Sequence, residues 1–493
     1  MSLAALAPGT RNLIDGELVD ASNGNTFENV SPSTEEVLGS VADGTKDDML
    51  NAVTAARRAF DETDWAENHE LRSKCLRQLY DGLIEEKEQL RSIVVHEAGA
   101  PVSLTGFMHV DNPIEMVTYW ADLASSYEYE TRMSDIEFMD TPQGRILRRE
   151  AMGVVGAITP WNVPVYLNIA KIAPSLASGC TIVLKPAPDT PWSATHMAKI
   201  IAEKTDIPAG VVNIVASADH LTGEILSTDP RVDLVSFTGS TATGRRIAEC
   251  AAPTLKKIFL ELGGKSANII LDDAMLEAVV PMGAMTCVHG GQGCAITTRM
   301  LVPRSRHDEA VELLKGAFAN WSYGDPTSPA NMQGPQISKR QQERVLAYIE
   351  KGKEEGAECV VGGGRPAHLE KGFYVEPTVF ANVDPEATIA QEEIFGPVLC
   401  VIPFEDDDDA VRIANDSEYG LSGSITSGDI ERALSVARRV RTGTLSVNGG
   451  MWFHPDTPFG GYKQSGIGRE NGVMGFEEHL ETKVIAVPAS YRG

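Results

Sequence analysis

Strands and helices alternate along residues 153–264, and this order constrains the fold more than any other feature of the chain. Five apolar runs predict strands, namely GVVGAI, CTIVLK, GVVNIVA, VDLVSF and KKIFLEL. Stretches with apolar residues three and four positions apart separate these runs and predict helices. Because strands that alternate with helices pair in parallel through right-handed crossovers, the region predicts an α/β fold with a doubly wound parallel sheet.

The flanking regions complete this picture. Residues 11–45 predict short strands and turns, and helical patterns follow up to residue 127. We expect a hairpin with its turn at 141–144, and a last strand at 479–488. A second α/β segment extends from residue 265 to about residue 463, and its acidic run EDDDD predicts a solvated loop or a helix start.

Composition excludes several classes of protein. The net charge of −26 argues against binding to nucleic acid or to anionic lipid. No apolar run approaches the ~20 residues of a membrane helix, and the N-terminus lacks a signal-peptide pattern, so we expect a cytoplasmic protein. The seven cysteines are scattered and no pair has CxxC spacing, so neither a metal site nor a disulfide framework is expected.

One cysteine has unusual surroundings. Cys294 lies in HGGQGCAITTRM, after three glycines in four positions. A buried cysteine is often only a small hydrophobe that fills a gap. A thiol set in bare backbone is alternatively a nucleophile that substrate and cofactor approach closely.

Other candidates lie where predicted strands end, which is where open parallel sheets bind ligands. Gly239 and Ser240 form a strand-to-helix turn that suits the binding of a phosphate or a simple helix cap. Lys185 suits the binding of a ribose or a phosphate, or is a solvated charge at a strand end. Glu261 suits a general base or an ordinary ion pair. Asn162 suits an oxyanion donor or a helix cap.

The motifs FTGST, LELGGK, GQGC, EEIFGPV and PFGGYKQSGIGRE occur in this order on one chain. With them, the sequence resembles the hydrolytic, NAD(P)-dependent, nonspecific branch of the aldehyde dehydrogenase superfamily, from about Leu13 to Ile485. The resemblance implies that Cys294 attacks an aldehyde, and that Asn162 and the backbone N–H of Cys294 bind the oxyanion. It implies that Glu261 activates water for hydrolysis of the thioester. It also implies a proton relay through Lys171 and Glu470, although Glu470 can instead be one half of a structural ion pair.

The resemblance also implies a coenzyme site. The residues it assigns to that site are Thr159, Trp161, Lys185, Gly239, Ser240, Leu262, Gly263, Gln341, Glu393 and Phe395. Two departures bear on the choice of coenzyme. Pro188 replaces a glutamate that repels a 2′-phosphate in many NAD-dependent members, whereas Asp219 adds a carboxylate on the adenine side. We therefore expect NAD as the preferred cofactor and leave NADP use open.

The expected substrate tunnel has small residues where acetaldehyde-type members have bulky aromatics. Its expected lining is Val163, Tyr166, Leu167, Ala170, Trp452, Phe453 and His454. No arginine cluster is positioned for a substrate carboxylate. We therefore expect a medium or bulky hydrophobic aldehyde.

The resemblance implies three structural parts. A coenzyme-binding domain takes residues 1–131 and 152–263, and a catalytic domain takes residues 264–465. Residues 132–151 and 479–493 form a small β extension for oligomerisation, so a homodimer or homotetramer is expected.

Three other functions fit this sequence less well. A CoA-acylating aldehyde dehydrogenase usually lacks the base at Glu261, and a non-catalytic structural protein has no need of Cys294, Glu261 and Asn162 together. A papain-like thiol hydrolase needs a histidine near the thiol. Only His289 is a candidate for that histidine, and we interpret it as a packing or loop residue.

Overall fold

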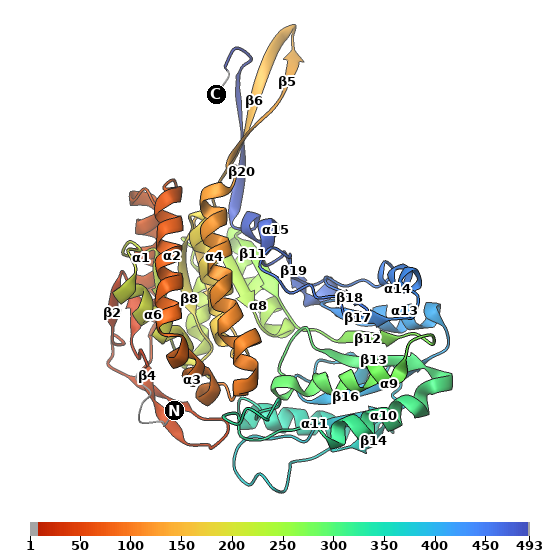
Figure 1. The fold of residues 1–493 in the computed structure, drawn as a ribbon. Coiled ribbons are helices and arrows are strands. Elements are labelled where there is room, and N and C mark those ends of the chain that lie inside the picture. Colours follow the sequence, from red (N-terminus) through yellow and green to blue (C-terminus); the bar gives the residue numbers. More distant parts are fainter. Residues whose placement is uncertain (1–7, 492–493) are drawn as a thin grey trace.

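The computed structural model describes residues 8–491, and it confirms an α/β fold (Figure 1). Five parallel strands form the centre of the first sheet, in the order β11-β10-β7-β8-β9. Their bounds are Val154–Ile158 (β7), Thr181–Lys185 (β8), Val212–Ile214 (β9), Leu234–Thr238 (β10) and Lys257–Glu261 (β11). All five coincide with the predicted apolar runs, so the doubly wound sheet is confirmed.

Helices cover both faces of this sheet. One layer contains α2 (His69–Glu85), α4 (Asp111–Ser126), α5 (Pro164–Ser178) and α6 (Pro191–Lys204). The opposite layer contains α1 (Lys46–Glu62), α7 (Glu224–Thr228) and α8 (Thr241–Ala251). A hydrophobic core lies between the sheet and each helix layer, and strand β8 contributes to both. Ile182 and Leu184 pack against the first layer, and Val183 packs against the second.

Short strands extend the first sheet at both edges. At one edge β9 pairs with β1 (Asn12–Ile14), which pairs with β2 (Glu17–Val19). At the other edge β11 pairs antiparallel with β19 (Gly466–Ile467), which brings a late part of the chain back to Glu261. A separate hairpin joins β3 (Thr26–Val30) to β4 (Val37–Ala42), and helix α3 covers Lys87–Glu97.

The second sheet has the order β14-β15-β16-β13-β12-β17-β18 and is parallel except at β14. Its strands are Ser266–Ile270 (β12), Thr297–Pro303 (β13), Glu358–Val361 (β14), Thr378–Ala381 (β15), Val398–Phe404 (β16), Gly423–Thr426 (β17) and Ser446–Val447 (β18). Its helices include His307–Ala319 (α10), Lys339–Glu354 (α11), Asp407–Asn415 (α13) and Ile430–Ala437 (α14). Shorter helical segments are Leu276–Val279 (α9), Thr388–Gln391 (α12) and Gly472–Glu477 (α15).

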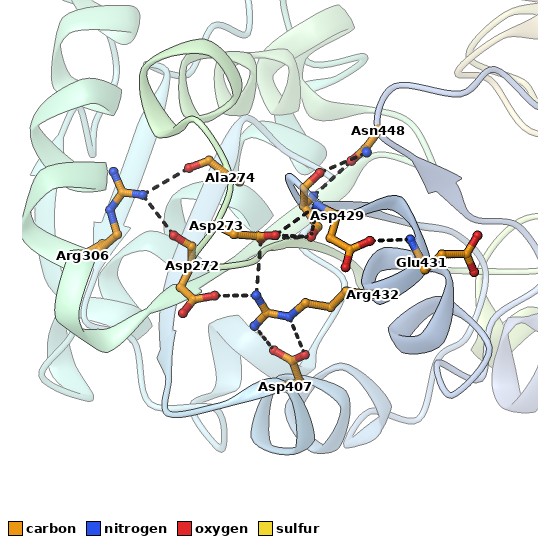
Figure 2. A network of polar contacts seen from close by, with 10 residues as sticks. Asp272, Asp273, Ala274, Arg306, Asp407, Asp429, Glu431, Arg432 and Asn448 are labelled. Carbon is orange, nitrogen blue, oxygen red and sulfur yellow. Dashed lines mark hydrogen bonds and ion pairs between the residues drawn. The ribbon is translucent and has the colours of Figure 1, made fainter.

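An ionic network holds one end of this second sheet together (Figure 2). The guanidinium of Arg432 donates two hydrogen bonds to Asp407, at 2.6 and 2.9 Å, and one to Asp272 at 2.6 Å. Asp407 is the first residue of α13, and Asp406 caps that helix. The acidic run EDDDD is therefore a helix start whose charges oppose an arginine and the positive end of the helix.

A three-stranded antiparallel sheet projects from the body of the molecule (Figure 1). It contains β5 (Glu130–Phe138), β6 (Thr141–Ala151) and β20 (Leu480–Pro488). The prediction of a turn at 141–144 was wrong, because the turn lies at Met139 and Asp140, which have φ of 49° and 57°. Both residues adopt the left-handed region without glycine, so the expected turn signal is missing there.

No helix within residues 8–491 is both long enough and apolar enough to cross a membrane.

Candidate active site

The parallel register of the first sheet brings the predicted residues to one edge. Ile158 pairs with Lys185, and Thr238 pairs with Glu261, so β7, β8, β10 and β11 end side by side. Asn162 lies in the segment after β7. The parallel pairing therefore explains why candidate residues that are distant in sequence lie at one edge of the sheet.

The Cys294 loop contacts this edge through backbone atoms. Residues 289–291 all have positive φ, between 53° and 71°, so the chain turns sharply before the cysteine. A Cβ placed on Gly264 would lie 2.3 Å from the carbonyl oxygen of Cys294. The absence of a side chain at Gly264 therefore lets the segment after Glu261 lie directly against the half-buried cysteine.

Asn162 is buried next to the same loop. Its Nδ2 donates a hydrogen bond of 2.9 Å to the carbonyl oxygen of Gln292, two residues before Cys294. A side-chain amide has two hydrogens, so one remains for an oxygen that develops negative charge nearby.

Glu261 is buried without a partner. The side chain is 1% exposed, and within residues 8–491 neither carboxylate oxygen accepts a hydrogen bond. Burial, and secondly the charge of Glu470, raise the pKa of Glu261 well above its usual value. The protein around Cys294 and the carboxylate of Glu261 raise the pKa of the thiol as well. Both shifts favour the uncharged, protonated forms of the carboxyl and the thiol.

Lys171 and Glu470 form a buried ion pair. Lys171 lies on α5 and is 1% exposed, while Glu470 follows β19 and is 5% exposed. The ammonium also lies 4.7 Å from the centroid of the Phe259 ring. Within the described chain, the second oxygen of Glu470 has no hydrogen-bond partner. The pair lies close enough to Glu261 for both charges to influence its pKa.

The predicted phosphate contact lies at the start of a helix. Ser240 is the N-cap of α8, and its Oγ accepts a hydrogen bond from Thr243 N at 3.3 Å. A Cβ on Gly244 would lie 2.6 Å from Leu262, so glycine allows α8 to pack closely on the segment after β11. Backbone N–H groups at a helix N-terminus suit a pyrophosphate.

The predicted nicotinamide-ribose residues come from the second sheet. Glu393 accepts a hydrogen bond of 2.9 Å from Gly264 N, and a Cβ on Gly263 would lie 2.6 Å from its other oxygen. Phe395 has φ of 59° and meets Trp161 edge to face, with ring centroids 5.4 Å apart. Gln341 donates to the carbonyl of Phe395 at 2.9 Å, so its amide nitrogen supports this segment.

Lys185 and two carboxylates lie where the adenosine of the coenzyme is expected. Burial lowers the pKa of Lys185 to about 8, and its ammonium donates to Ser217 O at 3.3 Å. Asp219 lines an adjoining cavity of about 570 Å³ and caps the next turn by accepting from Leu221 N at 2.8 Å. Asp43 lines the same cavity from the loop after β4 and accepts from Ala218 N at 2.9 Å. Sequence analysis missed Asp43, since nothing local distinguishes it.

An aromatic cluster lies on the expected substrate side. Phe453 contacts Tyr166, Phe107 and Trp452, with ring centroids 5.7, 5.8 and 6.2 Å apart. Trp452 stacks on Phe459 at 5.4 Å. Phe107 is 47% exposed and comes from a short π-helical segment, 105–109, that sequence analysis did not single out.

The remaining predicted residues lie around these groups. Thr159 is buried and donates to Asn168 Oδ1 at 2.7 Å, whereas His454 is exposed. Leu167 and Ala170 are buried on α5, and Val163 is half-buried just before that helix. Their roles in binding remain predictions.

Comparison with known proteins identifies the family. Residues 18–485 match the model of the aldehyde dehydrogenase family. The chain belongs to this family. It is 40% identical to aldehyde dehydrogenase 1 of Tanacetum cinerariifolium over 490 residues, which cover 99% of this chain and 97% of that protein.

Two solved aldehyde dehydrogenases have the same fold with bound molecules. One is the Mycobacterium tuberculosis enzyme complexed with NAD+, at 42% identity and a TM-score of 0.93, with 98% of this chain and 99% of that chain covered. The other is a mutant of aldehyde dehydrogenase C from Pseudomonas syringae, complexed with NAD+ and octanal. It shares 41% identity and a TM-score of 0.91, with 97% and 96% of the two chains covered.

Proposed function

We propose that the chain oxidises a hydrophobic aldehyde to the carboxylic acid with NAD+, through a thioester on Cys294. One observation carries the proposal: Asn162, Glu261 and Cys294 come from three distant segments and meet at one sheet edge, next to the helix start at Ser240. The two NAD+-bound relatives support the choice of coenzyme. When bound, NAD+ supplies the hydride acceptor.

The side chains have separate tasks. Glu261 takes the proton of the Cys294 thiol and passes it to solvent, and the thiolate attacks the aldehyde carbon. Asn162 donates a hydrogen bond to the resulting oxyanion. After the hydride has left that carbon, the oxyanion collapses to a thioester. Glu261 takes a proton from water, the water oxygen attacks the thioester, and the thiol of Cys294 is released with the acid.

The adenosine end favours NAD+ over NADP+. Pro188 removes one source of discrimination, but Asp43 and Asp219 place two carboxylates on a cavity wall beside Lys185. A 2′-phosphate there would meet two negative charges and the single positive charge of Lys185. We therefore infer a preference for NAD+.

The substrate is proposed to be a medium or bulky hydrophobic aldehyde. The rings of Phe107, Tyr166, Trp452 and Phe453 offer apolar contact area and no cation. The relative that was solved with octanal agrees with an apolar tunnel.

The projecting sheet is proposed to join subunits. Ile136, Phe138, Met139 and Val484 on it are exposed, with values from 43% to 82%. Exposed apolar residues on open sheet edges favour pairing with a second copy of the chain. Light scattering combined with size-exclusion chromatography measures the resulting dimer or tetramer.

The function is tested by NADH formation from NAD+ and benzaldehyde or octanal, without CoA, for the wild type and Cys294→Ala. We expect activity in the wild type and none in the variant. Activity that requires CoA would move the chain to the acylating reaction. No activity with any aldehyde, despite NAD+ binding, would refute the proposal.

A further inference from the structure

His289 makes a long-range contact with the residue that is proposed to bind the oxyanion. Its Nε2 lies 2.8 Å from the backbone carbonyl oxygen of Asn162, which is 127 positions away in sequence. A carbonyl oxygen only accepts, so Nε2 carries the hydrogen in this bond. The imidazole is 1% exposed, and no solvent competes for the contact.

This hydrogen bond is one of three that link three residues in a closed ring. The His289 side chain donates to the Asn162 backbone, and the Asn162 side chain donates to the Gln292 backbone at 2.9 Å. The Gln292 side chain donates in turn to the His289 backbone, also at 2.9 Å. All three residues are less than 5% exposed. The ring therefore ties Asn162 to the loop that carries Cys294, with each residue held by the next.

The loop is held in an unfavourable backbone conformation for this contact. His289 has φ of 53°, a left-handed conformation that costs free energy for any residue except glycine. Its backbone N–H donates to Met332 O at 2.9 Å, and Gln336 donates to Gly290 O at 2.8 Å. Such strain persists where surrounding contacts determine the conformation, and it gathers at functional sites.

His109 reinforces the orientation of the ring. The two imidazoles meet edge to face, with centroids 4.7 Å apart and planes at 75°. Burial lowers the pKa of both histidines, that of His289 to about 4, so both are neutral at physiological pH. A neutral imidazole that carries its one hydrogen on Nε2 satisfies the carbonyl of Asn162.

We propose that His289 is a positioning residue for the oxyanion site. It holds the backbone of Asn162 so that the amide hydrogen not used by Gln292 points at the oxyanion next to Cys294. The role rests on the proposed function of Asn162, and it replaces the interpretation of His289 as a packing residue.

A double-mutant cycle tests the role. The variants are His289→Leu, Asn162→Ala and their combination, and kcat/KM for the aldehyde is measured for each. We expect His289→Leu to lower kcat/KM by about 10- to 100-fold, mainly in kcat, since loss of an oxyanion donor itself costs about 10²–10³. In the Asn162→Ala background the same change should cost less than about threefold, because the residue it positions is already gone.

His479→Leu is the matched control. His479 is buried and also bonds a backbone carbonyl, Gly475 O, at 3.0 Å, but it has no contact with Asn162. We expect this variant to lower Tm as His289→Leu does while kcat/KM stays within about threefold of the wild type. The Kd for NAD+ and the rate of Cys294 alkylation by iodoacetamide should be unchanged in both variants, because neither NAD+ binding nor alkylation needs an oxyanion site.

Two outcomes would overturn the proposal. Equal losses in both backgrounds would show a general structural role, and no loss in the wild-type background would show no role. If His289→Leu does not fold, a neutron crystal structure of the wild type decides, with deuterium expected on Nε2. Deuterium on Nδ1 alone would refute the bond. A wild type without aldehyde oxidation would refute the proposed function and leave that neutron result valid.

Discussion

Replacing Glu470 by glutamine separates the two possible roles of this residue, a proton relay and a structural ion pair. Glu470 and Lys171 form an ion pair with exposures of 5% and 1%, so Glu470→Gln leaves a buried ammonium without its counter-charge. Breaking such a pair from one side costs about 3–5 kcal/mol. At about 1 °C per kcal/mol for a chain of this length, we expect Tm to fall by about 3–5 °C. The double variant Lys171→Met/Glu470→Gln removes both charges and should recover most of the loss.

The same substitution has a defined effect on the pH profile. Glu470 is the largest contributor after burial to the raised pKa of Glu261. Without that negative charge, the pKa of Glu261 falls, and the general base is deprotonated at lower pH. The acid limb of kcat should therefore move to lower pH, with less than a tenfold change on the plateau. The measurements are thermal unfolding and kcat from pH 5 to 9. An unchanged Tm with kcat lowered more than about 100-fold at every pH would refute the ion-pair argument and support a proton relay.

Three further perturbations have expected outcomes. Asp43→Asn/Asp219→Ser should raise the NADP+/NAD+ ratio of kcat/KM at least about tenfold, which corresponds to about 1.4 kcal/mol, since both carboxylates on this cavity wall repel a 2′-phosphate. An unchanged ratio would show that neither carboxylate faces the 2′ position. Gly264→Ala should lower kcat about 100-fold, because its Cβ would lie 2.3 Å from the carbonyl of the nucleophile. In the control Gly293→Ala, the new Cβ meets only the flexible end of an isoleucine, at 2.8 Å, and activity should be retained. His109→Leu should raise Tm below pH 6.5. In the wild type, burial keeps His109 neutral, and unfolding lets it take up a proton, so the folded state loses stability as pH falls. The variant lacks this loss. Equal Tm profiles from pH 5 to 8 would contradict that origin.

The strands of the first sheet could be predicted from the sequence because a local pattern of residues determines them. The apolar runs before Lys185 and Glu261 are strands because β-branched residues in short runs suit a buried parallel sheet. Their shared edge follows from parallel pairing, which the alternation with helices already implies. The hairpin turn was misplaced because Met139 and Asp140 adopt positive φ without glycine.

The parts that sequence did not predict depend on long-range contacts. Asp43 reaches the cavity that Asp219 also lines only because β4 ends beside the loop after β9, and its carboxylate accepts a hydrogen bond from Ala218 N, 175 positions away. The bond from His289 to Asn162 spans 127 positions and depends on a left-handed residue that carries no local signal. Such contacts are set by tertiary packing, which no window of sequence contains.

The glycines around Cys294 predict a thiol that substrate and cofactor approach closely, and the structure adds a backbone reason for Gly291. A Cβ on Gly291 would lie 2.1 Å from the carbonyl of Gly396, and φ there is 71°. Gly264 has the corresponding constraint against the Cys294 carbonyl. The bare backbone thus brings three chain segments into direct contact, so that a loop from the second sheet can present its thiol to Glu261 at the edge of the first.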